Sequence, residues 1–259
     1  MSRTRAKLSP FTVIGELLLL GGLGVFGFLL WQPWYTANVV AVAQSHVATN
    51  ISAQWVNAEP RKFEGEIPVP VPNSDTGVFG ILYVPAFGDN WANQLVTNRP
   101  MNPVMDDSAF GIAHYQDTAL PGQKGNVAFA AHRSGGHITP FRDVDFLRVG
   151  DPIFIETADG WFTYRFRSAE YVLPDGVGVL NPMPHIPDIY ADQDILTFTT
   201  CNPKYWGADE RMIAYSVFES FTPRADGPPA ELAQVNSNVA ESAKSHSNAT
   251  THFAARGDH

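Results

Sequence analysis

The hydrophobic pattern divides the chain into a long apolar run, a region of short apolar segments and a polar end. Residues 11–31 form a 21-residue run with one charge, Glu16. At 1.5 Å per residue, a helix of this length measures about 31 Å, which matches the hydrocarbon core of a bilayer. Arg3, Arg5 and Lys7 precede the run. We therefore expect a transmembrane helix over residues 11–31, a cytoplasmic N-terminus and the remainder of the chain outside the membrane.

A cleaved signal peptide is the alternative interpretation, because residues 41–43 (Ala-Val-Ala) resemble a cleavage site. The apolar part of a signal peptide is usually about 7–15 residues, which is shorter than this run. Trp34 and Tyr35 also lie before the cleavage site, at the position of an interfacial aromatic belt. The pattern favours a retained anchor.

The same pattern predicts a cytoplasmic end at residues 1–10, before the apolar run, and three segments after it. Residues 32–77 are predicted to be a stalk and a Pro-rich linker, with an uncharged, helix-compatible first part and a Pro-Val-Pro-Val-Pro run that favours polyproline II. The folded domain is predicted at residues 78–221. Residues 222–259 lack apolar periodicity and are predicted to be a disordered tail.

Within the domain, short apolar runs are separated by Gly, Pro, Asn and Asp, which is typical of strands. Phe162, Tyr164 and Phe166 alternate with polar neighbours, and the apolar positions between 213 and 217 repeat the alternation. A short helix is plausible at Pro140–Val149. Several strands with few helices indicate an all-β barrel or sandwich. The expected strands are Phe79–Val84, Phe110–His114, Asn126–Ala131, Pro152–Glu156, Trp161–Leu173, Ile195–Thr200 and Met212–Ser220.

Charge and composition narrow the function classes. The 259 residues contain 17 Lys and Arg against 26 Asp and Glu, a net charge of −9. Residues 1–31 contribute +2, so the outer part carries −9 − 2 = −11. An acidic body argues against nucleic-acid binding, which needs clustered Lys and Arg. The single cysteine excludes an intramolecular disulfide and a Cys-cluster zinc site.

That cysteine, Cys201, ends a strand-like run and is followed by Asn202 and Pro203, which favour a turn. Alternation places Cys201 on the same polar face as Thr197 and Thr199, so the thiol is expected to be accessible. A lone cysteine is more often an inert buried side chain than a nucleophile. Its neighbours decide between the two interpretations.

Two residue positions supply candidate partners. His132 ends another strand-like run, and an imidazole near a thiol can exchange protons with it and with a leaving group. Arg211 opens the last strand and can direct a fixed guanidinium at an oxyanion. Taken alone, the histidine could be structural and the arginine a solvated strand-end charge.

The ordered combination resembles the sortase family, and in particular its actinobacterial class E branch. Residues 196–203 (Leu-Thr-Phe-Thr-Thr-Cys-Asn-Pro) with Arg211 form one part of the resemblance. Residues 114–122 (His-Tyr-Gln-Asp-Thr-Ala-Leu-Pro-Gly) and 125–133 form another, and residues 15–18 (Gly-Glu-Leu-Leu) resemble the class E entry segment. Position 131 is Ala where the branch usually has Gly.

The resemblance implies a closed eight-stranded β-barrel with short helices and a cysteine transpeptidase activity. Cys201 would be the nucleophile, His132 the proton carrier and Arg211 the oxyanion stabiliser. Tyr115 and Thr200 would contact a Leu-Ala/Pro-x-Thr-Gly sorting signal, which is cut between Thr and Gly through a thioacyl intermediate. The partners would be secreted proteins bearing this signal and an amine of a peptidoglycan precursor. No metal or cofactor is expected.

Two other functions remain open. A pilus-polymerising sortase would share the three residues but usually carries a lid and a second hydrophobic segment near its C-terminus. A membrane-tethered, non-catalytic β-barrel binding module would make Cys201 and His132 structural.

Overall fold

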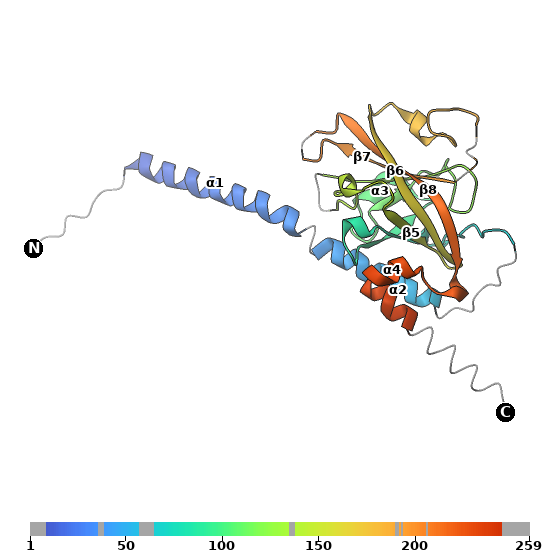
Figure 1. Cartoon of the computed structure of the whole chain (residues 1–259). Helices are drawn as coiled ribbons and strands as arrows, with labels where there is room; N and C mark the ends of the chain where they lie inside the picture. The colour runs from blue at the N-terminus through green and yellow to red at the C-terminus, as the bar shows by residue number, and fades with distance from the viewer. Residues whose placement is uncertain are drawn as a thin grey trace, which may run out of the picture.

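Eight strands close into a barrel in the order β1-β2-β3-β4-β7-β8-β6-β5 (Figure 1). The structure, a computed structural model, describes residues 9–35, 39–56, 65–134, 138–189, 192, 194–205 and 207–244. The expected closed eight-stranded barrel is confirmed. The strands are β1 (Val78–Tyr83), β2 (Ala92–Val96), β3 (Ile112–His114), β4 (Asn126–Ala131), β5 (Pro152–Glu156), β6 (Gly160–Val172), β7 (Ile195–Asn202) and β8 (Glu210–Pro223).

The barrel interior is the main hydrophobic core. Phe162, Tyr164 and Phe166 of β6 all belong to it, so the expected alternation in this strand is confirmed. In β8 the inward residues include Met212 and Ala214 rather than the odd-numbered positions from 213 to 217. Pairing explains the difference, because Ala214 lies opposite the inward-facing Phe198 of β7 and directly opposed residues share a face.

Strand β2 was not expected from the sequence, because its segment Ala92–Val96 contains Asn93 and Gln94. Both amides are buried and hydrogen bonded. Asn93 Nδ2 donates to Gln44 Oε1 at 3.0 Å, and Gln94 Nε2 donates to the carbonyl of Ala109 at 2.6 Å. Tertiary partners that lie far away in the sequence therefore permit a strand whose composition is polar.

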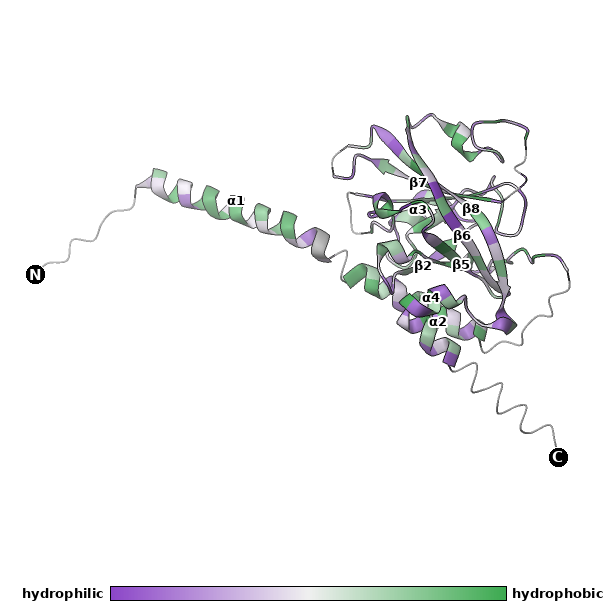
Figure 2. Ribbon diagram, viewed as in Figure 1, coloured by the Kyte–Doolittle hydropathy of each residue, from purple (hydrophilic) through white to green (hydrophobic). Residues whose placement is uncertain are grey.

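The N-terminal apolar run is helical, as expected. Helix α1 (Pro10–Tyr35) projects away from the barrel, and its surface is predominantly hydrophobic (Figure 2). Within the described part of the chain it is the one helix long and apolar enough to cross a membrane, over Pro10–Gln32, and the rest of the protein buries none of that segment. Residues 1–8 of the expected cytoplasmic end lie outside the described residues.

The region expected to be a stalk is helical in part but packs on the barrel. Helix α2 (Ala41–Val56) lies against β2, and Ser45 Oγ accepts a hydrogen bond from the amide of Ala92 at 3.2 Å. Ala48 is completely buried in the contact. The uncharged composition of this segment therefore reflects burial against the domain.

The expectation of a disordered tail from residue 222 is wrong for residues 222–244. Strand β8 runs to Pro223, and helix α4 (Ala230–Val235) and a further helical segment at 237–244 follow. Leu232 and Val239 are buried beside α2 and the outer face of the barrel. The two buried apolar residues are seven positions apart and only Ala233 packs beside them in the described part of this segment, so no periodic pattern marks it. The rest of the expected tail, 245–259, lies outside the described residues.

The remaining helices are short. The helix expected at Pro140–Val149 is reduced to the 3-10 helix η3, because Phe141, Val144 and Leu147 are drawn into the core by a series of turns. In chain order the short helices are η2 (Pro85–Phe87), α3 (Met101–Asp106), η3 (Val144–Phe146), η4 (Val177–Leu180) and η5 (Arg224–Asp226).

Candidate active site

Two parallel strands bring the candidate nucleophile and base to one edge of the barrel. β4 and β7 pair in parallel, and their last ladder pair is Ala130 with Thr199. Extending this register by two residues places His132 beside Cys201. Since parallel strands end at the same edge, both side chains lie at the barrel mouth.

Arg211 flanks the thiol from the other side. It lies directly opposite Cys201 in the antiparallel ladder of β7 and β8, and such partners share one face of the sheet. Its Nη1 donates to the carbonyls of Ala208 at 2.8 Å and Glu210 at 3.0 Å. The guanidinium is thereby held at the β7–β8 connection, and Cys201 itself is partly accessible.

His132 has an acidic partner that the sequence gave no reason to choose. Its Nε2 lies 2.8 Å from Asp106 Oδ1 at the end of α3. An ionised carboxylate only accepts hydrogen bonds, so Nε2 carries the proton and Nδ1 is available for proton exchange. This contact fixes the ring orientation, although 69% of the Asp106 side chain remains exposed.

Tyr115 lies on the same face as Cys201. Thr199 Oγ1 donates to the carbonyl of Phe129 at 3.3 Å, and the Tyr115 hydroxyl therefore donates to Thr199 Oγ1 at 2.9 Å. The residue before Tyr115 is the buried His114, whose ring is held because its Nε2 donates to the carbonyl of Ala119 at 2.9 Å. Burial lowers the pKa of His114, and the hydrogen bond to Ala119 only partly opposes this effect.

Thr200 points away from this face and is 3% exposed. Its hydroxyl donates to the carbonyl of Ala131 at 2.7 Å, which joins β7 to β4 immediately before Cys201 and His132. The structure therefore brings Cys201, His132, Arg211 and Tyr115 together and leaves Thr200 behind them.

A hollow of about 570 Å³ continues from Tyr115 toward the segment between β6 and β7. Its walls include Met101 of α3 and Val177 and Leu180 of η4. Asn126 secures this segment, because its Nδ2 donates to the carbonyl of Val179 at 2.9 Å. Polar residues, among them Arg99, Asp117 and Asn181, complete its lining, so the hollow offers both polar and apolar surface next to the site.

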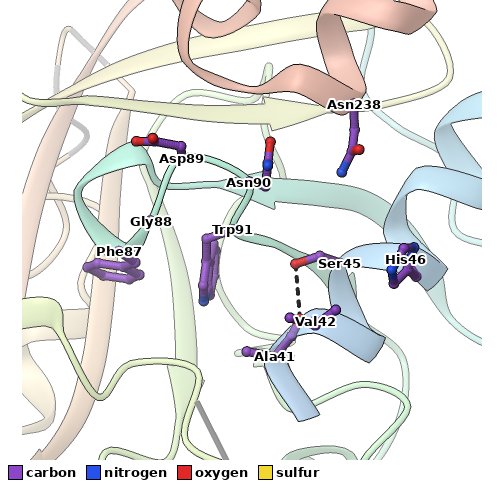
Figure 3. Close-up of a pocket in the computed structure, with 10 residues that line it drawn as sticks. All are labelled: Ala41, Val42, Ser45, His46, Phe87, Gly88, Asp89, Asn90, Trp91 and Asn238. Atoms are coloured by element: carbon purple, nitrogen blue, oxygen red, sulfur yellow. Dashed lines mark hydrogen bonds between the residues drawn. The ribbon is translucent and has the colours of Figure 1, made fainter. Parts of the chain in front are cut away.

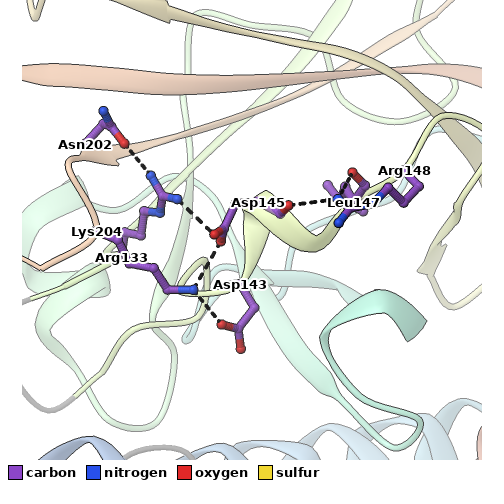
Figure 4. Close-up of polar contacts among 7 residues, drawn as sticks. All are labelled: Arg133, Asp143, Asp145, Leu147, Arg148, Asn202 and Lys204. Carbon is purple, nitrogen blue, oxygen red and sulfur yellow. Dashed lines mark hydrogen bonds and ion pairs between the residues drawn. The ribbon is translucent and has the colours of Figure 1, made fainter.

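A polar cluster contacts the side chain of Asn202, the residue after Cys201, and was not predicted from the sequence. Buried Arg133 and partly buried Lys204 converge on Asp145 (Figure 4), at 3.4 Å and 3.2 Å. Lys204 also contacts Asp143 at 3.0 Å. Burial alone would raise the pKa of Asp145, but the Lys204 hydrogen bond, with the charges of Lys204 and Arg133, lowers it overall. The only signal in the sequence is adjacency, because Arg133 follows His132.

A second hollow, of about 350 Å³, lies where α2 meets the β1–β2 connection (Figure 3). Phe87 and Trp91 form one wall, with ring centroids 5.2 Å apart. None of Cys201, His132 or Arg211 lines it. The candidate site is thus defined by the three residues at the barrel mouth.

Comparison with known proteins supports the resemblance found in the sequence. Residues 82–219 match the family described as Sortase domain. Sortase SrtE1 of Streptomyces coelicolor is 32% identical over 228 residues, which cover 85% of this chain and 60% of that protein. Sortase SrtE2 of the same species is 30% identical over 240 residues, which cover 88% of this chain and 90% of that protein. The chain thus spans about 60% of the length of the first of these relatives.

Solved structures give the same result. Sortase E1 from Streptomyces coelicolor, solved with a tripeptide in its active site, superposes with a TM-score of 0.54 at 30% identity and covers 62% of this chain and 99% of that chain. Sortase E from Streptomyces avermitilis superposes with a TM-score of 0.52 at 31% identity and covers 60% of this chain and 96% of that chain. The resemblance to class E is confirmed, and the chain belongs to the sortase family of cysteine transpeptidases.

Proposed function

We propose that this protein is a membrane-anchored transpeptidase that cuts a Leu-Ala/Pro-x-Thr-Gly sorting signal between Thr and Gly and attaches the protein that bears it to the cell wall. The observation that carries the proposal is the position of Cys201, which lies opposite Arg211 on β8 and, by the register of β4, beside His132. A thiol between an imidazole and a guanidinium is suited to acyl transfer.

In the first step the Cys201 thiol gives its proton to His132, and the resulting thiolate attacks the carbonyl carbon of the signal threonine. A carbon–sulfur bond forms, and the carbonyl oxygen takes the negative charge that Arg211 stabilises. The carbon–nitrogen bond to glycine then breaks, and His132 gives a proton to the departing amine. The product of this step is a thioacyl enzyme.

In the second step an amine of a peptidoglycan precursor attacks the thioester carbon. His132 takes the proton that the amine loses, a new amide bond forms, and the carbon–sulfur bond breaks to regenerate the thiolate. Every proton and bond is accounted for within the enzyme and its two substrates, so this sequence of steps uses no cofactor.

The backbone of the bound sorting signal is proposed to cross the face that Tyr115 and Cys201 share, with the upstream residues of the signal in the hollow beside Tyr115. An aromatic ring suits contact with a small alanine side chain of the signal. Thr200 is buried and bonded to Ala131. We propose that it serves the substrate indirectly, by fixing the strand that carries Cys201.

Helix α1 is proposed to anchor the enzyme with its N-terminus in the cytoplasm, because three positive residues precede the apolar run. Residues 36–40 connect α1 to α2, and an extended connection of this length spans at most about 18 Å. Since α2 packs on β2, the barrel would be held close to the outer face of the membrane that α1 spans.

The proposal is tested with the full chain in detergent and a Leu-Ala-x-Thr-Gly peptide, by mass spectrometry of the acyl adduct. We expect an adduct on Cys201 in the wild type and none in Cys201→Ala. Arg211→Ala is expected to slow acylation by about 10²–10³-fold, as for a lost oxyanion donor. Arg148→Gln, in an exposed turn, serves as the matched control and should acylate normally.

Two results would contradict the proposal. If folded wild type with a reduced thiol forms no adduct with the alanine or the proline form of the signal, the proposed activity on these signals is wrong. If Arg211→Ala acylates at the wild-type rate, the oxyanion role is wrong.

A further inference from the structure

Arg133 is a buried charge with no assigned role, and it directly follows His132. Only 3% of the residue is exposed. Burying a guanidinium is unfavourable unless its partners compensate, so its contacts indicate what it does. One of them is unusually close to the nucleophile. Nη1 donates to Oδ1 of Asn202, the residue after Cys201, at 2.6 Å.

This bond is one of two hydrogen bonds that lie on either side of the proposed catalytic pair, His132 and Cys201, and we call the two bonds together the bracket. The ladder of β4 and β7 ends at Ala130 and Thr199, so backbone pairing does not reach His132 and Cys201. On the ladder side, the Thr200 hydroxyl bonds the carbonyl preceding His132 at 2.7 Å. On the other side, Arg133 bonds the side chain following Cys201. The two bonds enclose the two reacting residues.

Arg133 is itself fixed by a second partner besides Asn202. Its Nη2 lies 3.4 Å from Asp145 Oδ1, in the connection between β4 and β5. The same carboxylate binds Lys204, three residues after Cys201, at 3.2 Å. Figure 4 shows this chain of contacts from Asn202 through Arg133 to Asp145 and Lys204. The turn after the nucleophile is thus attached to the strand of the base at two points.

We propose that Arg133 is a positioning residue that sets the separation between the His132 imidazole and the Cys201 thiol by tying Asn202 to Asp145. The proposal rests on the acyl-transfer function proposed above. Arg133 touches neither the substrate nor the reacting atoms. Because a displacement of about 1 Å in a reacting pair can reduce the rate by 10²-fold, loss of this bracket is expected to affect chemistry rather than peptide binding.

The test is Arg133→Lys in the full chain, with single-turnover acylation measured over a range of peptide concentrations. Lysine keeps the charge but is a point donor that cannot serve Asn202 and Asp145 with a planar fork. The acylation rate should fall about 10–100-fold at saturating peptide, with half-saturation changed less than about threefold. Arg167→Gln is the matched control, because Arg167 is an exposed residue of β6 outside this group of contacts, and the variant should stay within twofold.

A double-mutant cycle separates positioning from general destabilisation. In a His132→Ala background, Arg133→Lys should reduce the residual rate less than about threefold, since the pair it positions is already broken. An undiminished effect in that background would overturn the proposal, as would a wild-type rate in Arg133→Lys or a change confined to half-saturation. Asn202→Ala, judged by the same three criteria, decides the question if Arg133→Lys does not fold.

A second readout does not depend on the substrate. The rate at which iodoacetamide alkylates Cys201 reports the thiolate, and its pH profile should change in Arg133→Lys and remain unchanged in Arg167→Gln. If the wild type fails to acylate any signal peptide but the profile changes as expected, the proposed function is wrong and the positioning role stands. An unchanged profile overturns the positioning role.

Discussion

Arg133 and Arg224 are both 3% exposed, yet they occupy different kinds of environment. Arg224 lies over Trp161, 4.5 Å from its ring centroid, and its Nη2 donates to the fully buried Glu156 at 2.9 Å. Arg133 instead bonds the amide of Asn202 and a carboxylate, Asp145, whose side chain is 37% exposed. The two arginines are thus equally buried, but the carboxylate that pairs with Arg224 is buried, whereas the one that pairs with Arg133 is partly exposed to solvent.

The difference shows that burial of a charge does not by itself identify its role. The Arg224 cluster joins four parts of the chain, because Arg224 of η5, Ser52 of α2 and Tyr83 of β1 all donate to the carboxylate of Glu156 on β5, the last two at 2.8 Å and 2.6 Å. It holds α2 and the C-terminal segment on the barrel. The Arg133 cluster connects the two strand ends that carry the site. We therefore expect Arg224 to control stability and Arg133 to control rate.

Glu156→Gln tests the first half of this comparison and should give the largest effect on stability. It leaves Arg224 buried without a countercharge, which typically destabilises a fold by about 3–5 kcal/mol. Chemical denaturation should show this loss, while the acylation rate of the folded fraction stays unchanged. Asp145→Asn is the matched change at Arg133 and should lose less stability, because its carboxylate is partly hydrated. Equal losses in the two variants would remove the distinction.

Tyr83→Phe should give a smaller effect that depends on pH. The variant removes a donor to Glu156, which is expected to reduce stability by about 1–3 kcal/mol at neutral pH. Burial, followed by the negative charge of Glu156, raises the pKa of Tyr83. A raised folded pKa favours folding below the unfolded value of about 10, and this contribution is lost as the pH rises through the folded pKa.

The measurement is the free energy of unfolding of both proteins between neutral pH and the alkaline range. The wild type should lose stability above pH ~10, and Tyr83→Phe should lose less over the same interval. Tyr164 and Tyr215 also have raised pKa values, so part of the alkaline loss should persist in the variant. Parallel curves would show that the Tyr83 hydroxyl is not held in its neutral form.

Arg165→Gln should give the smallest effect and sets the lower limit of the comparison. Arg165 binds Glu231 at 2.7 Å and Glu219 at 2.8 Å, but these carboxylate side chains are 47% and 46% exposed. Exposed pairs contribute about 0–1 kcal/mol and are screened by salt. Urea unfolding at low salt and in 1 M NaCl should show a difference that disappears at high salt. A loss comparable to that of Glu156→Gln would contradict the role assigned to burial.

Much of the fold could be predicted from the sequence, because most strands bury an apolar face that their own residues record. Asn126–Ala131 and Pro152–Glu156 have the expected bounds. Strand β2 and the C-terminal helices could not be predicted in this way. Asn93 and Gln94 are stabilised in a strand by partners from α2 and from the segment before β3, and Leu232 is buried by α2. These contacts exist only in the tertiary structure.

The candidate site shows the same division. The motif around Cys201, together with His132 and Arg211, indicated the candidate site because this ordered combination resembles the sortase family, whereas each residue alone was ambiguous. Asp106 and Asp145 were invisible, since a single acidic residue before a turn resembles many others on a surface. Their selection depends on the distance of the folded contact, 2.8 Å to His132 in the case of Asp106.

The parallel pairing of β4 and β7 has a consequence for the time at which the enzyme acquires its reactivity. His132 and Cys201 are 69 residues apart in the chain, and no local hairpin can bring them together. In a newly made, unfolded chain the Cys201 thiol and the His132 imidazole are therefore not held together. They become neighbours when this long-range ladder forms, which is a slow, late kind of contact in β proteins. The reactivity proposed for Cys201 is thus gained only on folding.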